Sequence, residues 1–394
     1  MDQENQQKKL KISQIDSHRE HAEKLFLSLS YDDVLLVPTL SDINSRDDVV
    51  TETQITPKIK LSIPIISSNM DTVTGVEMAL EIAKLGGLGI LPRFDDIETQ
   101  AVKVEQVKRY GGLVGAAVGV KEGFIDRASR LVKAGVDVLV LDVAHGHMTK
   151  VLEATSLLKH AFNDVELICG NVATYEGAMD LFNAGADSVK VGVGPGSICT
   201  TRIMSGSGVP QISAVLHAAK AAREVGKTII CDGGTKTPGD VAKGLAAGAS
   251  AVMIGSMLAG TNEAPGEIIS VQKKHTKEAY LFGIKFFELE IREGLPQKFK
   301  RYNGSTSKAE KHSQVKKDAS DKSGSYTEYV EGVEAMVPYK GPVESVVKRI
   351  MAGVRSGMSY SGSRTIEEFW ENAEFVRITA QGVKESNAHD VHTL

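Results

Sequence analysis

Three stretches of the sequence, KAGVDVLVLD (133–142), NAGADSVKVG (183–192) and AAGASAVMIG (246–255), repeat one pattern that decides the fold. In each stretch a glycine ends a helical segment just before a short apolar run. The residue after a helix often has left-handed backbone, which glycine adopts more readily than other residues. We therefore expect three helix ends that lead directly into buried strands, at Gly135, Gly185 and Gly248.

Apolar runs of this kind occur eight times along the chain. They begin at Pro64, Leu88, Leu113, Val136, Val165, Ser188, Thr228 and Ala251. The runs are rich in Val and Ile and show little polar alternation, which is typical of parallel strands covered on both faces. Segments between them, such as VEMALEIAKLGG (76–87), have helical periodicity. The order is therefore strand then helix, repeated.

Eight strand–helix units predict an α/β fold, a (β/α)8 TIM barrel. The alternative is an open, doubly wound parallel sheet. We favour the barrel because no G-x-G-x-x-G motif opens a helix after the first strand. We expect residues 1–25 to form a polar N-terminal arm and residues 26–394 a single catalytic barrel. The Lys- and Ser-rich segment at about 272–331 is expected to be a mobile flap, after which a helical pattern from Val343 closes the barrel.

Composition excludes several classes of partner. The formal net charge is -4 and the hydrophobic fraction is 42%, so the chain has no broad basic field for nucleic acid or an anionic membrane. It contains 3 cysteines and no C-x-x-C pair, which argues against a disulfide scaffold or a zinc site. The N-terminus is polar where a signal peptide is apolar. We expect a cytoplasmic protein.

In a TIM barrel the active site lies where the strands end, and polar residues follow most of the predicted strands. The candidate segments are Ser67 to Asp71, Asp142 to His147, Gly170-Asn171, GVGPGSICTTR (192–202), Asp232 to Gly234, and Gly255-Ser256.

The segment GVGPGSICTTR is the most specific of these signals. Its glycines and proline form a stiff turn that would present Cys199 outward. Backbone amides of the turn, together with Arg202, would lower the pKa of the thiol and favour the nucleophilic thiolate. Cys169 and Cys231 lie inside apolar runs, so we expect them to be small buried hydrophobes.

Glycines after the seventh and eighth strands indicate a phosphate-binding corner, because backbone N–H groups converge there in this fold. The residues are Asp232, Gly233, Gly234, Gly255 and Ser256, with Ser197 adding a hydroxyl from the neighbouring loop. Asp232 suits a ribose diol.

His145 and His147 resemble a metal pair. No third ligand stands out beyond Asp71 and Asp142, so we interpret them as a polar pocket wall near Asp142.

The sequence of these loops resembles that of the IMP dehydrogenase and GMP reductase family. In this chain the resemblance extends from YDDVLLVP (31–38) to KESNAHDV (384–391). The matching motifs include NMDTVT (69–74), DVAHGH (142–147), GNVAT (170–174), GVGPGSICTTR, CDGG (231–234), GSMLAGTNEAPGE (255–267), EGVEAMVPYKG (331–341) and SGMSYSG (356–362).

The resemblance implies a purine nucleotide oxidoreductase in which Cys199 bonds to C2 of a purine mononucleotide and NADPH or NAD exchanges a hydride there. It implies catalytic roles for Thr201 and Glu331. It places the nucleotide at Ser68, Asn171, Ser197, Asp232, Gly233, Gly234, Gly255, Ser256 and Tyr302, and the cofactor near Asp142 and His145. It also implies a homotetramer with a K⁺ ion bound by Gly194, Gly196 and Cys199 and by a neighbouring subunit's Glu385 and Ser386.

Different motifs favour different members of the family, IMP dehydrogenase or GMP reductase. Dehydrogenases often carry CBS domains between the second and third strands, but only residues 95–110 separate Phe94 from Gly111 here. Where dehydrogenases have an Arg-Tyr pair that activates water, this chain has Val315-Lys316-Lys317-Asp318. These features favour GMP reductase. The motifs DVAHGH and KESNAHDV favour IMP dehydrogenase, and the altered flap leaves a third reading, a purine-nucleotide-binding protein with impaired turnover.

Overall fold

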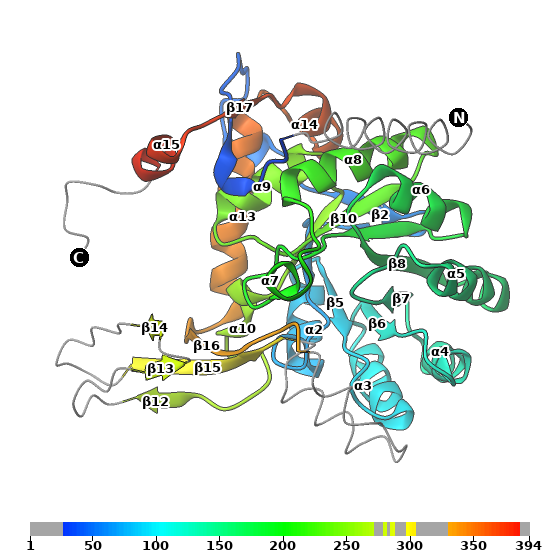
Figure 1. The fold of residues 1–394 in the computed structure, drawn as a ribbon. Helices are drawn as coiled ribbons and strands as arrows, with labels where there is room; N and C mark the ends of the chain where they lie inside the picture. Colours follow the sequence, from blue (N-terminus) through cyan, green and yellow to red (C-terminus); the bar gives the residue numbers. More distant parts are fainter. Residues whose placement is uncertain (1–26, 272–278, 282–283, 288–296, 305–329, 387–394) are drawn as a thin grey trace, which may run out of the picture.

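The computed structural model describes residues 27–271, 279–281, 284–287, 297–304 and 330–386 (Figure 1). The expected N-terminal arm and most of the expected flap lie outside these residues. Eight parallel strands form a closed barrel in the order β10-β11-β4-β5-β6-β7-β8-β9. Their bounds are β4 (Ile65–Ser67), β5 (Leu88–Leu91), β6 (Val114–Val118), β7 (Val138–Asp142), β8 (Glu166–Val172), β9 (Ser188–Val191), β10 (Thr228–Asp232) and β11 (Ala251–Ile254).

The eight predicted apolar runs supply these eight strands. Closure occurs where the last strand pairs with the first, in the register Val252↔Ile65. An open sheet would leave both of those strands with an unpaired edge, so the doubly wound alternative is wrong. The chain forms a (β/α)8 barrel.

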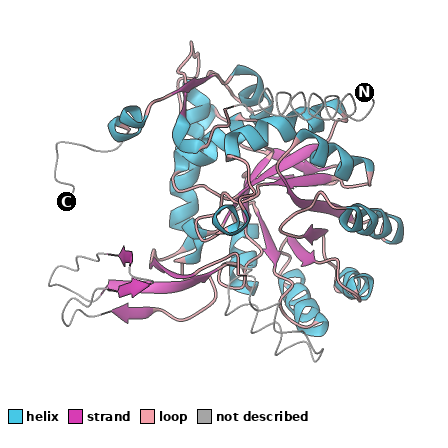
Figure 2. Cartoon of the chain, in the orientation of Figure 1, coloured by secondary structure: helices cyan, strands magenta, loops and turns pink. Residues whose placement is uncertain are grey.

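Helices surround the barrel on its outside, as Figure 2 shows. They are α2 (Val76–Lys84), α3 (Ile97–Arg109), α4 (Phe124–Lys133), α5 (Thr149–Ala161), α6 (Tyr175–Asn183), α8 (Gln211–Glu224), α9 (Pro238–Ala246) and α13 (Val343–Tyr360). The predicted helix ends at Gly135, Gly185 and Gly248 have φ of +88°, +111° and +111°. The single helix α3 connects β5 with β6, and α13 packs between α2 and α9 to close the ring.

Two apolar layers hold the barrel together. One lies between the strands and the helices, and the other fills the interior of the barrel. The interior layer contains Ile66, Leu88, Ile90, Val140, Ile168, Ile230 and Met253, all at most 1% exposed. Because side chains fill the interior, a ligand has access only at the ends of the strands.

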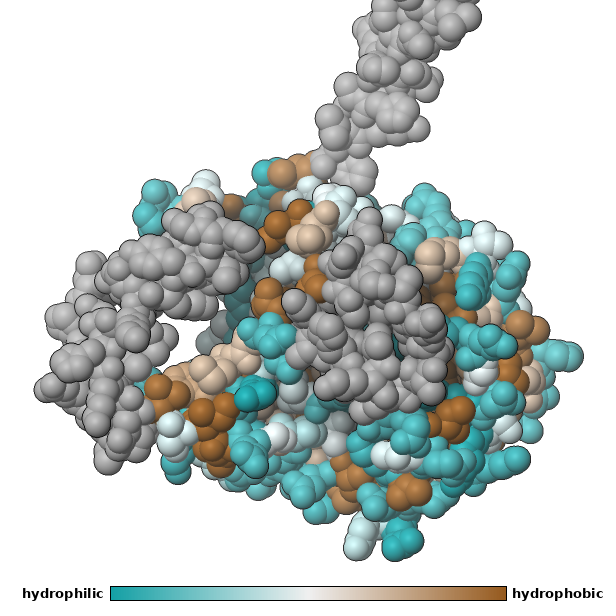
Figure 3. All heavy atoms as spheres, turned by 60° about the horizontal axis from the view of Figure 1, so that its bottom comes forward, coloured by the Kyte–Doolittle hydropathy of each residue, from teal (hydrophilic) through white to brown (hydrophobic). Residues whose placement is uncertain are grey.

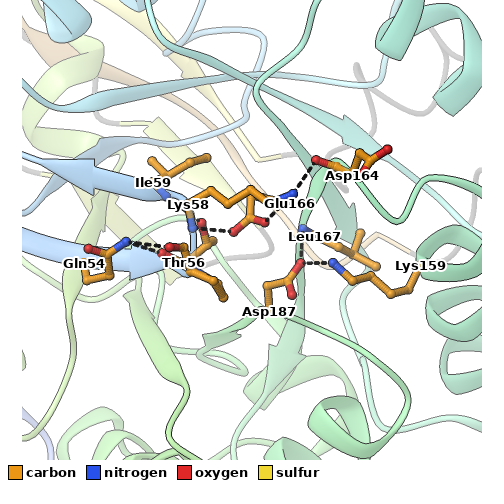
Figure 4. Close-up of polar contacts among 10 residues, drawn as sticks. Gln54, Thr56, Lys58, Ile59, Lys159, Asp164, Glu166, Leu167 and Asp187 are labelled. Atoms are coloured by element: carbon orange, nitrogen blue, oxygen red, sulfur yellow. Dashed lines mark hydrogen bonds and ion pairs between the residues drawn. The ribbon is translucent and has the colours of Figure 1, made fainter.

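A hairpin that the sequence analysis did not predict closes the bottom of the barrel. Strands β2 (Thr53–Thr56) and β3 (Ile59–Leu61) place Ile55, Ile59 and Leu61 in the interior layer. The Lys58 backbone N–H donates to Glu166 Oε2 at 3.0 Å, at the start of β8 (Figure 4). The hairpin leaves the opposite, carboxyl end of the strands as the open end.

A second unpredicted sheet lies beside the open end and includes part of the expected flap. Strand β15 (Gln297–Asn303) pairs with β12 (Ile269–Val271) on one side and with β16 (Glu334–Pro338) on the other. The register with β16 joins Tyr302 to Ala335. β15, from within the expected flap, therefore lies between the strand that precedes the flap and the strand that follows it.

The remaining elements are short. They are η1 (Tyr31–Asp33), β1 (Val34–Leu36), η2 (Arg46–Asp48), α7 (Thr201–Ser205), α10 (Ser256–Ala259), β13 (Ala279–Leu281), β14 (Ile284–Phe287), α14 (Ile366–Asn372), β17 (Phe375–Arg377) and α15 (Ala380–Glu385). Apolar side chains on the described part of the face in Figure 3 are scattered among hydrophilic ones. Within the part of the chain that the structure describes, no helix has both the length and the apolar character to cross a membrane.

Candidate active site

A cavity of about 220 Å³ opens at the carboxyl ends of the barrel strands. It brings together most of the predicted site residues, which come from segments far apart in the sequence. These are Ser68, Asp142, Asn171, Gly194, Gly196, Ser197, Cys199, Thr201, Asp232, Gly233, Gly234, Gly255, Ser256, Tyr302 and Glu331.

A chain of hydrogen bonds starts at the Cys199 thiol, on the loop after β9. The thiol donates to Thr201 Oγ1 at 3.2 Å, and the Thr201 hydroxyl donates to Glu331 Oε2 at 3.0 Å. Glu331 lies just before β16, and its carbonyl accepts the Thr200 backbone N–H at 2.9 Å. A nucleophile, a hydroxyl and a carboxylate are thereby aligned at the cavity, although 130 residues separate Thr201 from Glu331.

Arg202 has a different neighbour from the one expected. Its Nη2 donates to the Val209 carbonyl at 2.6 Å, so the group hydrogen-bonded to the thiol is Thr201. Cys169 and Cys231 are 0% exposed, as expected of buried hydrophobes. Burial raises the pKa of Cys169 to about 12 and that of Cys231 to about 11. Of the three thiols, Cys199 alone lines the cavity.

The glycines after β10 and β11 give the backbone close access to the cavity. Gly233 and Gly234 have φ of +92° and +86°, which L side chains rarely adopt. A Cβ on Gly255 would lie 2.7 Å from the Tyr302 hydroxyl, so glycine lets Tyr302 approach. Burial raises the pKa of Tyr302 to about 12, although a hydrogen bond with Ser197 opposes the shift. Tyr302 therefore stays protonated and can donate to an anion.

Lys190 is a site residue that the sequence analysis missed. It lies on β9 and is 1% exposed, and its Nζ donates to Asp142 Oδ1 and to Asp232 Oδ2, each at 2.8 Å. Burial alone would lower the pKa of Lys190, but the two carboxylates raise it. Burial likewise favours a raised pKa for Asp142, but Lys190 and Arg93 lower it. One ammonium thus pairs with two carboxylates at the cavity wall.

The residue type gave the only signal for Lys190. A lysine inside the apolar run SVKVGVG is unusual, because lysine is almost never fully buried unless it is paired.

Two polar atoms at the cavity are buried and have no hydrogen-bond partner among the described residues. They are Asn171 Oδ1, an acceptor, and Arg93 Nε, a donor. The Asn171 amide nitrogen is already engaged, since it donates to Asp232 Oδ2 at 2.9 Å and to the Gly192 carbonyl at 2.8 Å. Buried polar atoms rarely remain unpaired, so both atoms are suited to contact a ligand.

Three predicted site residues lie outside the lining of this cavity. His145 is exposed, next to Ala144, which does line the cavity. Glu385 and Ser386 lie at the end of α15, which projects from the body of the molecule in Figure 1. His147, the other histidine of the predicted pair, contacts Asp180 Oδ2 through its Nε2 at 2.8 Å.

Comparison with known proteins agrees with this geometry. The family model described as IMP dehydrogenase / GMP reductase domain matches residues 28–284 and 288–389. The IMP dehydrogenase of Cryptosporidium parvum is 40% identical, covering 93% of this chain and 96% of that protein. The GMP reductase of Leishmania donovani is 34% identical, covering 93% and 97%.

Among solved structures, a cysteine-to-alanine variant of GMP reductase from Trypanosoma brucei, in complex with guanosine 5'-monophosphate, superimposes with a TM-score of 0.84. It is 32% identical, and the match covers 94% of this chain and 100% of that one. With the family model matched over nearly the whole chain and the barrel reproduced, the chain belongs to the IMP dehydrogenase / GMP reductase family of oxidoreductases.

Proposed function

We propose that the protein is a GMP reductase that converts GMP and NADPH into IMP, ammonia and NADP⁺. The observation that carries the proposal is the hydrogen-bonded series from Cys199 through Thr201 to Glu331 at the cavity. A reaction that replaces the 2-amino group of a purine by hydrogen needs a nucleophile for C2 and a route for the proton that the amine takes away. This series supplies both.

The first half of the reaction uses residues of this chain alone. Cys199 Sγ bonds to C2, the bond from C2 to the amino nitrogen breaks, and the nitrogen leaves as ammonia with the proton of the thiol. Thr201 lies between the thiol and Glu331, so it can pass that proton to the carboxylate and back to the departing amine. The product is a covalent adduct with a C2–Sγ bond, and the exchange of amine for sulfur leaves the net charge unchanged.

The nucleotide's phosphate and ribose have separate positions in the cavity. Backbone amides of Gly233, Gly234 and Gly255, with the Tyr302 hydroxyl, suit the phosphate. Asp232, held by Lys190, suits the ribose diol, and Asn171 Oδ1 offers a further acceptor. Ser68, Ser197 and Ser256 add hydroxyl groups around the same ligand.

A second cavity adjoins the first and is proposed to take part of the dinucleotide. It measures about 280 Å³ and shares Arg93 with the first cavity, where Asp142 lies. Its lining holds the carboxylate residues Asp95, Asp96 and Glu122 and the cationic residues Arg93, Lys121 and Arg127. Arg93 Nε is the buried donor without a partner among the described residues. The three cationic residues suit phosphates of NADPH. Bound NADPH supplies a hydride to C2, which with one proton restores the thiol as the C2–Sγ bond breaks.

The reductase reading needs no group that activates water. The nearest Arg-Tyr pair to Glu331 is Arg301-Tyr302, on β15, and it does not occupy the position of such a group: Tyr302 is 5% exposed and lines the nucleotide cavity, whereas Arg301 is exposed. Residues 315–318, the position of the pair in dehydrogenases, lie outside the described residues.

The second candidate is IMP dehydrogenase, which turns IMP, NAD⁺ and water into XMP and NADH. The 40% identity to a protein of that name favours it.

Two spectrophotometric assays separate the candidates. Purified protein is given GMP with NADPH, and in a separate cuvette IMP with NAD⁺, while the absorbance of the reduced nicotinamide is followed. Loss of NADPH supports the reductase. Gain of NADH with formation of XMP replaces it with the dehydrogenase. If neither changes while GMP still binds in calorimetry, the protein is a purine nucleotide binder, and the proposal is wrong.

A further inference from the structure

A buried lysine outside the cavity is hydrogen-bonded to several backbone carbonyls. Lys300 lies on β15 and is 2% exposed. Its Nζ donates to three backbone carbonyls, those of Thr261 at 3.0 Å, Asn262 at 3.4 Å and Ala264. All three belong to the turn after α10, the helix that begins at the predicted phosphate residue Ser256.

The number of carbonyls indicates the protonated form. An ammonium has three N–H donors, one for each carbonyl, whereas a neutral amine would turn its lone pair toward an oxygen. Burial lowers the pKa of Lys300, and the charges of Glu263 and Glu77 oppose that shift. The carbonyls replace the hydration that the ammonium loses, since a buried charge is costly unless it is hydrogen-bonded.

Strand geometry links this contact to the cavity. Side chains two residues apart lie on the same face of a strand, so Lys300 and Tyr302 point toward the barrel together. β15 also pairs with β16, and beyond that ladder the Gly304 N–H donates to the Val333 carbonyl at 3.1 Å. The Val333 N–H donates to the Ile198 carbonyl at 3.0 Å, next to Cys199. The segment carrying Glu331 is therefore fixed by the same sheet.

We propose that Lys300 is a positioning residue, whose ammonium acts as a fixed internal cation that holds β15 and β16 against the turn after α10. The contact thereby fixes the position of the Tyr302 hydroxyl relative to the nucleotide and that of the Glu331 carboxylate relative to Thr201. The inference rests on the proposed function, because that function gives Tyr302 and Glu331 their roles. Lys300 itself touches no reacting atom.

The first test compares Lys300→Met with Lys298→Met. Lys298 lies on the same strand, is exposed, and carries the same charge. Its Nζ lies over the Tyr339 ring, 5.8 Å from the centroid, and makes no hydrogen bond to the three carbonyls. For Lys300→Met we expect KM for GMP to rise and kcat to fall, each about tenfold, since small displacements of catalytic groups have large effects. We expect Lys298→Met to stay within about twofold of the parent. Equal kinetics of the two variants would overturn the proposal.

The second test restores the cation from solution. Lys300→Ala removes three carbons and the nitrogen, which propylammonium can replace, whereas ammonium itself is unsuitable because ammonia is a product of the proposed reaction. We expect saturable recovery of kcat with propylammonium and none with tetramethylammonium, which has the charge but no N–H donor. Recovery with both salts, or with neither, contradicts the proposed cation role.

A third readout does not depend on turnover. Hydrogen exchange measured by mass spectrometry should show faster exchange of the β15 and β16 amides in Lys300→Ala, and propylammonium should slow it again. If the parent protein turns over neither GMP nor IMP, the proposed function fails, but this experiment still decides the role of Lys300. Unchanged exchange in the variant overturns that role whatever the activity.

Discussion

At the scale of the residue, the chemistry depends on the Cys199 thiol. Replacing it by the hydroxyl of serine keeps the shape and removes a far better nucleophile, so we expect Cys199→Ser to lose turnover by at least about 10³-fold while GMP binds as before. Denaturing mass spectrometry of the parent mixed with GMP should show a purine adduct on Cys199. The matched control is Cys169→Ala, which removes a buried thiol. Substantial turnover in Cys199→Ser would exclude the covalent mechanism.

Thr201 and Glu331 are tested by changes that keep their size. Thr201→Val and Glu331→Gln each interrupt the proton route but leave the thiol in place, so we expect kcat to fall about 10²- to 10⁴-fold with little change in GMP affinity. Because the two residues act in series, the double variant should lose little more than either single one. Thr200→Val, one residue away and outside the cavity lining, serves as control. Multiplicative losses in the double variant would show that the residues act separately.

At the scale of the element, strand β9 carries a buried charge that the barrel must balance. Lys190→Met leaves the half-buried Asp142 and Asp232 without their shared ammonium, and we expect a loss of about 3 kcal/mol in the free energy of unfolding at neutral pH. The control variant is Lys236→Met, which breaks the exposed ion pair between Lys236 and Asp32. We expect its free energy of unfolding to fall by less than about 1 kcal/mol.

The pH dependence of that loss has a definite sign. In the parent, Lys190 and Arg93 lower the pKa of Asp142, so its contribution is present above the pKa of an unfolded aspartate and is lost as pH falls. In Lys190→Met, burial favours a raised pKa for Asp142, although Arg93 still opposes that shift. The folded variant then takes up protons more readily than its unfolded chain. Urea unfolding at pH 5 and pH 7 should show that the difference in free energy of unfolding between the parent and Lys190→Met is smaller at pH 5. A larger difference at pH 5 would contradict the ion pairs of Lys190 with the two carboxylates.

At the scale of the whole molecule, local patterns predict the barrel and most of the site, and non-local pairing accounts for what they miss. Gly135 and its counterparts reveal helix ends because their backbone conformation depends on neighbouring residues. The β2–β3 hairpin and the β15–β16 pair depend on contacts with parts of the chain that are distant in sequence, so the local pattern of apolar residues does not predict them. Lys190 was missed for the same reason, since only folding places Asp142 and Asp232 beside it.

Assembly supplies the last prediction. Gly194, Gly196 and Cys199 line the cavity, whereas Glu385 and Ser386 lie at the end of the projecting helix α15, so we expect a K⁺ site that uses all five residues to need a neighbouring subunit. We expect light scattering to show a tetramer of 42.3 kDa chains, and KCl to stimulate turnover over LiCl at equal ionic strength. Deleting residues 379–394 should remove the stimulation, whereas deleting residues 387–394 should leave it. A monomer with undiminished K⁺ stimulation would show that each chain binds the cation alone.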